Sequence, residues 1–318
     1  MKKLTSPPTL TDIIQAHEAI RPYVHRTPIL QSQYFNKKSK SQLFFKCENF
    51  QKVGAFKMRG ATCATLALSE SEKAKGITTH SSGNHGQAVA LSAKLQKIPA
   101  YIVMPENAPQ IKVDAVKEYG AEVIPCTSSQ RGREEKLAEV VKRTGATFIH
   151  PYNDYNVIAG QATAAKELLE AVEDLDTILV PVGGGGIISG TALVTHYLSP
   201  KTKVVGAEPI GANDAYRSLQ TGELQKNETV NTIADGLRSD VKEKTFGIMQ
   251  TYLSEIIPVP DEAIIATMRQ IWERMKIIIE PSCAVPLAAL LQEVHRFEGQ
   301  RIGIILTGGN VDLEKLPF

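Results

Sequence analysis

Short apolar segments alternate with longer amphipathic segments along most of the chain. Runs of a few Val, Ile and Leu residues indicate strands, and stretches in which apolar residues recur every three or four positions indicate helices. The predicted strands cover residues 43–46, 77–80, 100–104, 122–125, 147–150, 177–182, 203–207 and 301–306. The predicted helices cover residues 56–68, 86–95, 111–119, 134–143, 159–171, 186–197, 262–275 and 285–296.

This alternation predicts an α/β fold with two open, mostly parallel twisted sheets flanked by helices. The strand segments are almost continuously apolar, which is typical of parallel strands that are buried on both faces. Residues 75–150 form a compact series of strands and helices. We interpret them as a small domain inserted into a larger, discontinuous domain of residues 1–74 and 151–318.

Composition and charge exclude several classes of protein. The 318 residues suggest about two domains, and the hydrophobic fraction of 42 % is ordinary for a globular protein. A net charge of +2 gives no electrostatic reason to expect nucleic acid or an anionic membrane as a partner. The 4 cysteines form no C-x-x-C pair, and the first residues lack the apolar core of a signal peptide. We therefore expect a reduced, cytoplasmic protein.

The strongest local motif is a run of four glycines in residues 182–190 (VGGGGIISG), between a predicted strand and a predicted helix. Backbone amides and a helix N-terminus at such a turn suit a phosphate group. The dinucleotide fingerprint fails, because Ile188 or Ser189 occupies the position of its third glycine. However, Glu208 ends the next strand, where a dinucleotide fold carries its ribose-binding acid. A nicotinamide cofactor therefore stays open at this point.

Three other turns combine small and polar residues next to predicted strands or helices. Residues 81–86 (SSGNHG) offer hydroxyl, amide and imidazole groups that suit a carboxylate, although a plain helix cap is the alternative. Lys57, in residues 54–60 (GAFKMRG), begins a predicted helix; a partly apolar site would lower its pKa and allow a Schiff base. A solvated surface lysine is the alternative. With residues 306–310 (LTGGN), these turns predict one cleft between two lobes.

The motifs resemble those of fold-type II pyridoxal-phosphate enzymes, in the same order and over nearly the whole chain. The resemblance is closest to the branch of the serine racemases and serine/threonine dehydratases, and it implies a tryptophan synthase β-like fold. The matching segments are FKCENFQK (45–52), GAFK (54–57), SSGNHG (81–86), the four glycines, AEP (207–209), IEPS (279–282) and TGGN (307–310).

The resemblance also implies roles for individual residues. Lys57 would hold pyridoxal phosphate covalently and act as the base at the substrate Cα, and Ser82 would lie on the opposite face of the cofactor. The implied cofactor-binding residues are Phe56, Lys57, Asn84, Gly183, Gly184, Gly185, Gly186 and Thr307. The implied substrate-binding residues are Ser81, Ser82, Gly83, Asn84, His85, Arg133 and Asp235.

The function implied by the resemblance is β-elimination from serine- or threonine-type β-hydroxy amino acids, which yields a 2-oxo acid and ammonia, together with serine racemisation. A dedicated 3-hydroxyaspartate dehydratase or racemase is the alternative. More distant alternatives are a non-catalytic carrier of pyridoxal phosphate and a NAD-dependent oxidoreductase.

A metal site and a homodimer complete the expectations from the resemblance. Glu208, the Ala212 carbonyl and Asp214 would bind Mg²⁺ or Ca²⁺, with Mn²⁺ as a further candidate, because hard cations prefer oxygen ligands. Two solvated carboxylates are the alternative reading. Val53 stands where nucleotide-binding racemases carry Thr, which speaks against activation by ATP although Lys52 is kept.

Overall fold

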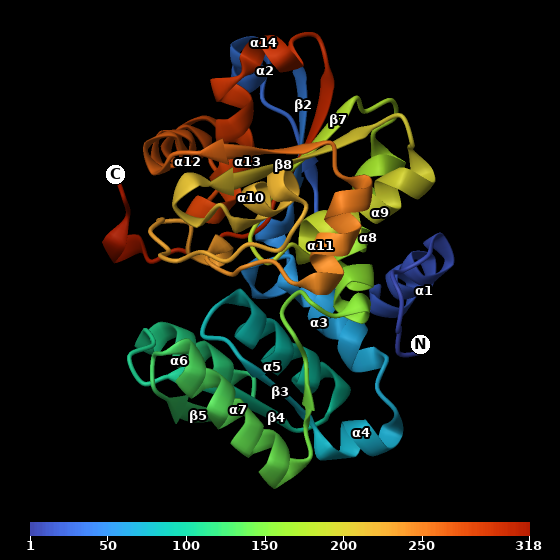
Figure 1. Ribbon diagram of the computed structural model, residues 1–318, viewed down its shortest axis with the longest axis vertical. Coiled ribbons are helices and arrows are strands. Elements are labelled where there is room, and N and C mark those ends of the chain that lie inside the picture. Colours follow the sequence, from blue (N-terminus) through green and yellow to red (C-terminus); the bar gives the residue numbers. More distant parts are fainter.

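The computed structural model describes residues 1–318 apart from the side chain of Ile111. Figure 1 shows a larger sheet with its helices above a smaller sheet with its own helices. The larger sheet has the strand order β1-β2-β10-β7-β8-β9, and all neighbours are parallel except β1 and β2. The smaller sheet has the order β5-β4-β3-β6 and is entirely parallel. The predicted fold class is confirmed.

The element bounds are as follows. The strands are β1 (Ile29–Leu30), β2 (Gln42–Cys47), β3 (Ile77–His80), β4 (Ala100–Pro105), β5 (Glu122–Cys126), β6 (Thr147–Phe148), β7 (Thr177–Pro181), β8 (Lys203–Pro209), β9 (Glu255–Val259) and β10 (Arg301–Leu306). The helices are α1 (Leu10–Ile20), α2 (Gln33–Ser39), α3 (Lys57–Leu66), α4 (Glu70–Lys75), α5 (Asn84–Gln96), α6 (Gln110–Glu118), α7 (Gln130–Thr144), α8 (Tyr155–Ala171), α9 (Gly186–Leu198), α10 (Asp214–Thr221), α11 (Glu243–Tyr252), α12 (Asp261–Met275), α13 (Pro281–Gln292) and α14 (Val294–Phe297). Short 3₁₀ turns are η1 (Glu48–Phe50), η2 (Lys52–Gly54), η3 (Ile210–Ala212), η4 (Asp235–Leu237) and η5 (Leu313–Lys315).

Each predicted strand and helix is present, with ends that differ by a few residues, and the last predicted helix is divided into α13 and α14. The sequence analysis missed β1, β9, α1, α2, α4, α10 and α11. Pro258 interrupts the apolar pattern of β9, but β9 is an edge strand, where a missing N–H is tolerated. Helix α1 begins with a capping box between Thr9 and Asp12, a signal that the periodicity search did not use.

Helices cover both faces of each sheet. Helices α2, α12 and α13 pack one face of the larger sheet, and α1, α8 and α9 pack the other. In the smaller sheet, α5 and α6 share a core with one face, while Val140 of α7 packs against the other. Ala61 and Ala64 of α3 belong to the core that α5 and α6 share, and α3 also contacts α8, so α3 joins the two parts of the molecule. The predicted division into domains stays a prediction.

Helices α3 and α8 approach each other closely at a pair of glycines. A Cβ atom added at Gly160 would lie 2.6 Å from the Arg59 carbonyl oxygen and 2.7 Å from the Gly60 Cα. Such short distances leave no room for a methyl group unless one helix moves. In the part of the chain that the structure describes, no helix is both long and apolar enough to cross a membrane.

We predict that Gly160→Ala lowers the free energy of unfolding by about 1–3 kcal/mol, because overpacking forces α3 and α8 apart. Urea unfolding of the full chain measures the effect. Gly247→Ala in α11 is the matched control: its added Cβ meets nothing within 4 Å, so it should stabilise the protein by up to about 1 kcal/mol. An unchanged stability of Gly160→Ala would contradict the close helix contact.

Candidate active site

Lys57 is the first residue of α3, and its side chain is half-buried. Its Nζ donates a hydrogen bond to the Pro151 carbonyl oxygen at 3.0 Å and lies 5.0 Å from the centre of the Phe56 ring. Burial lowers the pKa of Lys57 to about 8, and the charge of Glu280 offsets part of this effect. An amine with this pKa is neutral in a far larger fraction of molecules near physiological pH than an ordinary lysine, and the neutral form can attack a carbonyl carbon or accept a proton.

The segment before Lys57 is hydrogen-bonded to the end of β10. The Phe56 amide donates to the Thr307 carbonyl oxygen at 3.0 Å, and further bonds join residues 53–55 to residues 308–310. Thr307 is itself buried. The resemblance placed Phe56, Lys57 and Thr307 at one cofactor site, and the structure brings these residues together.

The four glycines follow β7 and lead into α9. Gly185 has a φ of 87°, a conformation that glycine adopts without strain. Within the described residues, the amides of Gly183 to Gly186 donate no hydrogen bond. A Cβ atom on Gly184 would lie 2.4 Å from the Tyr152 ring, so this position has no room for a side chain. Free amides at a helix N-terminus form a site suited to a phosphate group.

Residues 81–83 connect β3 to α5, residues 84–86 begin that helix, and Ser81, Ser82 and Gly83 are half-buried. The His85 Nε2 bonds to the Ile149 carbonyl oxygen at 2.9 Å, while its buried Nδ1 has no partner in the described chain. Burial, assisted by the charge of Lys57, lowers the pKa of His85 to about 3, so the ring is neutral. Structural contacts alone assign no role to the Ser82 hydroxyl.

Glu280 is a buried carboxylate hydrogen-bonded to Asn84, and its local sequence offered no reason to assign it a role. Both of its carboxylate oxygens accept hydrogen bonds from the Asn84 side chain, at 3.1 and 3.0 Å, and Asn84 in turn accepts one from Asn310 at 2.9 Å. Burial and the charge of Asp235 raise the pKa of Glu280 to about 7. Glu280 belongs to the IEPS motif, but a Glu directly before Pro281 is also typical of an ordinary helix N-terminus, so the sequence alone did not single it out.

Arg133 and Asp235 are less closely tied to Lys57. Asp235 begins η4, near enough to Glu280 to raise its pKa, and its carboxylate lies 3.6 Å from the Lys112 amine. Arg133 is half-buried on α7, and its Nε has no hydrogen-bond partner among the described residues. No hydrogen bond or ion pair in the described part of the chain joins either residue to Lys57.

Comparison with known proteins decides the family. Residues 20–308 match the model of the family described as pyridoxal-phosphate dependent enzyme. The chain belongs to this family. It is 49 % identical to the beta-hydroxyaspartate dehydratase of Paracoccus denitrificans (strain Pd 1222), over 98 % of this chain and 99 % of that protein.

Two solved structures show the same fold. The serine racemase of Dictyostelium discoideum has 48 % sequence identity and a TM-score of 0.92, with 96 % of this chain and 99 % of that chain covered. The serine racemase of maize has 45 % identity and a TM-score of 0.93, with 96 % of this chain and 94 % of that chain covered. The family match confirms the predicted resemblance and favours pyridoxal phosphate over the nicotinamide cofactor that the glycine run left open.

The residues of this pyridoxal-phosphate dependent enzyme fit its cofactor. The free amides of the four glycines can hold a phosphate, and Lys57 offers an amine whose only partner in the described residues is a carbonyl oxygen. A carboxylate paired with Lys57 would keep the amine protonated, and the described residues place none in an ion pair with it.

The residues predicted to bind a metal lie together beyond β8. Glu208 lies at the end of that strand, Ala212 lies in η3 and Asp214 begins α10, and all three are buried. Burial and the charge of Asp214 raise the pKa of Glu208, and burial raises that of Asp214 to about 6. The described residues contain no group of three or more His, Cys, Asp or Glu that could hold a metal ion. Any such site therefore depends on two carboxylates and a carbonyl.

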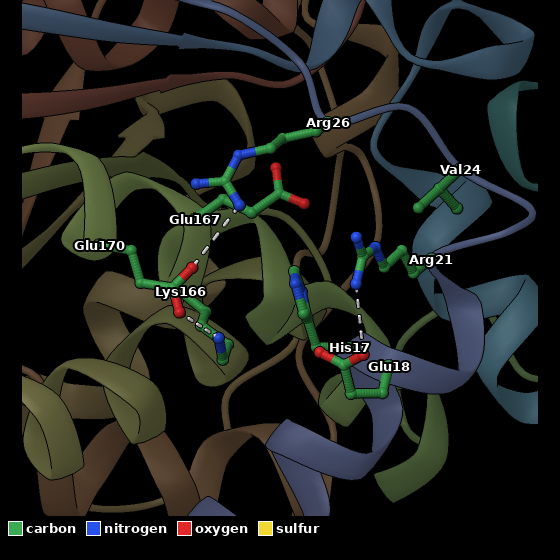
Figure 2. A pocket seen from close by; sticks show the side chains of 8 residues that line it. All are labelled: His17, Glu18, Arg21, Val24, Arg26, Lys166, Glu167 and Glu170. Atoms are coloured by element: carbon green, nitrogen blue, oxygen red, sulfur yellow. Dashed lines mark hydrogen bonds and ion pairs between the residues drawn. The ribbon is translucent and has the colours of Figure 1, made fainter.

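A separate cavity of about 290 Å³ opens between α1 and α8, and none of the predicted site residues lines it (Figure 2). Its walls carry charges of both signs. The lining residues are His17, Glu18, Arg21, Val24, Arg26, Lys166, Glu167 and Glu170.

Glu280 should make stability depend on pH. Because its pKa is raised from 4.5 to about 7, the folded protein holds this proton more tightly than the unfolded chain. The resulting stabilisation is present below pH 4.5 and is lost as the pH rises through about 7. We predict that Glu280→Gln gains stability relative to the unmodified chain as the pH rises across this interval.

Thermal unfolding of both proteins between pH 4.5 and about 8 tests this prediction, since titrating groups that do not interact with Glu280 contribute equally to both proteins and cancel in the difference. A difference in melting temperature that stays constant across the interval would show that Glu280 is not held protonated.

Proposed function

We propose that this enzyme eliminates water from β-hydroxy amino acids, that hydrolysis of the elimination product gives a 2-oxo acid and ammonia, and that the enzyme also racemises serine. The observation that carries the proposal is the half-buried Lys57, with its pKa of about 8, next to a segment hydrogen-bonded to the end of β10. The reactions named for the dehydratase and racemase relatives support the same chemistry.

When bound, pyridoxal phosphate withdraws electrons from the substrate Cα. The amides of Gly183 to Gly186 hold the phosphate, and the amides and hydroxyls of residues 81–85 hold the substrate carboxylate. The neutral amine of Lys57 removes the α-proton. The β-hydroxyl takes up a proton and departs as water, which completes the elimination, and a water molecule then hydrolyses the released enamine to the 2-oxo acid and ammonia. Return of a proton from Ser82 on the other face completes the racemisation instead.

A dicarboxylate substrate, 3-hydroxyaspartate, is the second candidate. Arg133 favours it, because the Nε of this guanidinium is buried and lacks a partner in the described chain. A second substrate carboxylate would satisfy this donor, and Arg binds carboxylates in a two-bond geometry that Lys does not reproduce. Serine offers no such group.

One assay tests the function and separates the substrates. We expect 2-oxo acid from L-Ser, L-Thr or 3-hydroxyaspartate, and the opposite enantiomer from L-Ser or D-Ser. Lys57→Gln should abolish both reactions, because it removes the base. Ser82→Ala should suppress racemisation at least about tenfold while elimination from one enantiomer persists.

Arg133→Met should selectively reduce turnover of 3-hydroxyaspartate if that substrate is the physiological one. If the purified protein binds no cofactor, or binds it and turns over none of these amino acids, the proposed function is wrong. If Ser82→Ala leaves both activities unchanged, Ser82 is not the second proton donor.

We also propose that Glu208, the Ala212 carbonyl and Asp214 bind Mg²⁺ or Ca²⁺. The carboxylate of Glu208 accepts hydrogen bonds only from the Ala215 and Tyr216 amides in the described chain, at 3.1 and 2.8 Å, although the charge of Asp214 lies nearby. Two buried carboxylates without a Lys or Arg in an ion pair leave uncompensated negative charge, which a divalent cation would offset.

Chelation should therefore lower the melting temperature, and Mg²⁺ or Ca²⁺ should restore it. At a cation concentration of about 100 times the Kd, binding stabilises the folded state by about 2.7 kcal/mol. Glu208→Gln is the matched variant: it removes one ligand and one repelling charge, so chelation should have no effect on it. If neither the chelator nor the added cation changes the melting temperature of the unmodified enzyme, the proposed metal site is wrong.

The remaining expectations are a homodimer without activation by ATP and a cytoplasmic location. Val53, in place of the Thr of nucleotide-binding racemases, supports the absence of an ATP effect.

A further inference from the structure

Four ionised side chains lie together in the interior, and we call them the buried quartet. They come from β2, η1, α3 and α8, and their exposed fractions are 1, 0, 0 and 3 % for Lys46, Glu48, Arg59 and Glu167. Two charges of each sign make the set neutral. Four full charges without water are costly unless every partner is in place.

The partners are in place, and Arg59 holds them together. Its Nε and Nη2 donate to the two oxygens of Glu48 at 2.7 and 2.8 Å, and its Nη1 and Nη2 donate to Glu167 at 2.9 Å. The amine of Lys46 donates to Glu167 at 2.6 Å. Two threonines complete the set. The Thr27 hydroxyl donates a hydrogen bond to Glu48 at 2.5 Å, and the Thr163 hydroxyl accepts one from Arg59 at 3.1 Å.

Arg59, the central residue of the quartet, follows Lys57 closely in the chain. Arg59 is two residues beyond Lys57, in the first turn of α3, and the Arg59–Glu48 pair closes the segment 48–59 that leads to this lysine. Within that segment Val53 has a φ of 56°, a left-handed conformation that β-branched residues rarely adopt. Such a conformation persists only where the surrounding contacts enforce it.

Glu167 connects the quartet to the cavity between α1 and α8. Figure 2 shows its carboxylate in the cavity wall beside the Arg26 guanidinium, whereas Glu170 lies between Arg26 and Lys166. Neither of these cations pairs with Glu167: Arg26 and Lys166 both face Glu170 instead. Both oxygens of Glu167 therefore remain committed to Arg59 and Lys46.

We propose that Arg59 is a positioning residue, which with Glu48 and Glu167 fixes the first turn of α3 and so the place at which the Lys57 amine emerges. The inference rests on the proposed role of Lys57. Bonds to residues 307–310 hold the chain before Lys57, and the quartet holds it after Lys57. These two sets of contacts restrict the position of the Lys57 amine, although no carboxylate in the described chain is paired with it.

A purely stabilising role is a poorer explanation of the quartet. Apolar residues of similar volume stabilise a core as well as a buried ion pair does, whereas ion pairs accept only one geometry. The neighbouring core residues Ala61, Cys63 and Ala159 are apolar or small, and all are buried. A set of charges is retained here at the one helix start that carries Lys57.

The test compares Arg59→Lys with the unmodified full chain after removal of the cofactor. Competitive acylation by acetic anhydride, read by mass spectrometry, gives the titration midpoint of the single amine of Lys57. Arg59→Lys keeps the charge but loses the two-bond geometry, so Lys57 should become more hydrated. We expect its midpoint to rise by about one unit, and capture of added pyridoxal phosphate near pH 8 to slow about fivefold.

A matched control separates position from general destabilisation. Phe297→Ala opens a cavity in α14, in the core on the far side of the larger sheet, and should lower the melting temperature without moving the Lys57 midpoint. Glu48→Gln distinguishes the two effects by the direction of the shift. Loss of the negative charge alone would lower the pKa of Lys57, whereas loss of the fixed position of the Lys57 amine would raise it. The titratable groups that face Lys57, namely Glu280, His85 and His150, are unchanged in all variants.

An unmoved Lys57 midpoint in Arg59→Lys, with a melting temperature lowered as in Phe297→Ala, overturns the proposal. If Arg59→Lys does not fold, Thr27→Val decides, because it removes only the one hydroxyl that donates to Glu48, leaves all four charges in place and should shift the midpoint upward by a smaller amount. If the unmodified chain captures no cofactor, the proposed function fails, yet the acylation midpoints still show whether Arg59 positions Lys57.

Discussion

Everything at the active site depends on how a neutral amine is held in place without an anionic partner. A buried lysine is most simply satisfied by a carboxylate, but that pairing would keep it protonated and unreactive. Here the charges are separated: Lys46 and Arg59 have Glu48 and Glu167 as partners, and among the described residues Lys57 donates a hydrogen bond only to the Pro151 carbonyl oxygen. The rigid ion pairs therefore fix the backbone, while the reactive amine stays free of them.

The same arrangement joins the two sheets. Helix α3 contributes to the core of the smaller sheet and packs against α8, where Gly60 and Gly160 allow close approach. The site takes the four glycines and Thr307 from the larger sheet and residues 81–86 from the smaller one. The Asn84–Glu280 and Asn84–Asn310 hydrogen bonds cross between these parts. Residues 81–86, which we propose to hold the substrate, are therefore tied to groups carried by the larger sheet.

Local patterns were sufficient for the parallel strands and the turns after them, because continuous apolar runs and glycine-rich turns are signals that neighbouring residues carry. For Lys57 they left a solvated surface lysine open, and only the family resemblance implied a role for it. They were insufficient for β9, where Pro258 is tolerated only because the strand is at an edge. They also failed for Glu280 and the quartet. Lys46 and Glu167 are 121 positions apart, and each reads locally as a solvated charge, so only the tertiary fold reveals the pair.

The central claim is that the chain delivers one reactive lysine, Lys57, to pyridoxal phosphate. The most direct measurement is borohydride reduction of the purified holoenzyme, followed by proteolysis and mass spectrometry of every lysine-containing peptide. The account predicts the reduced cofactor on Lys57 alone, in the peptide that also contains Phe56. Cofactor on any other lysine, including the neighbouring Lys52 or the buried Lys46, would contradict it, as would the absence of a labelled lysine.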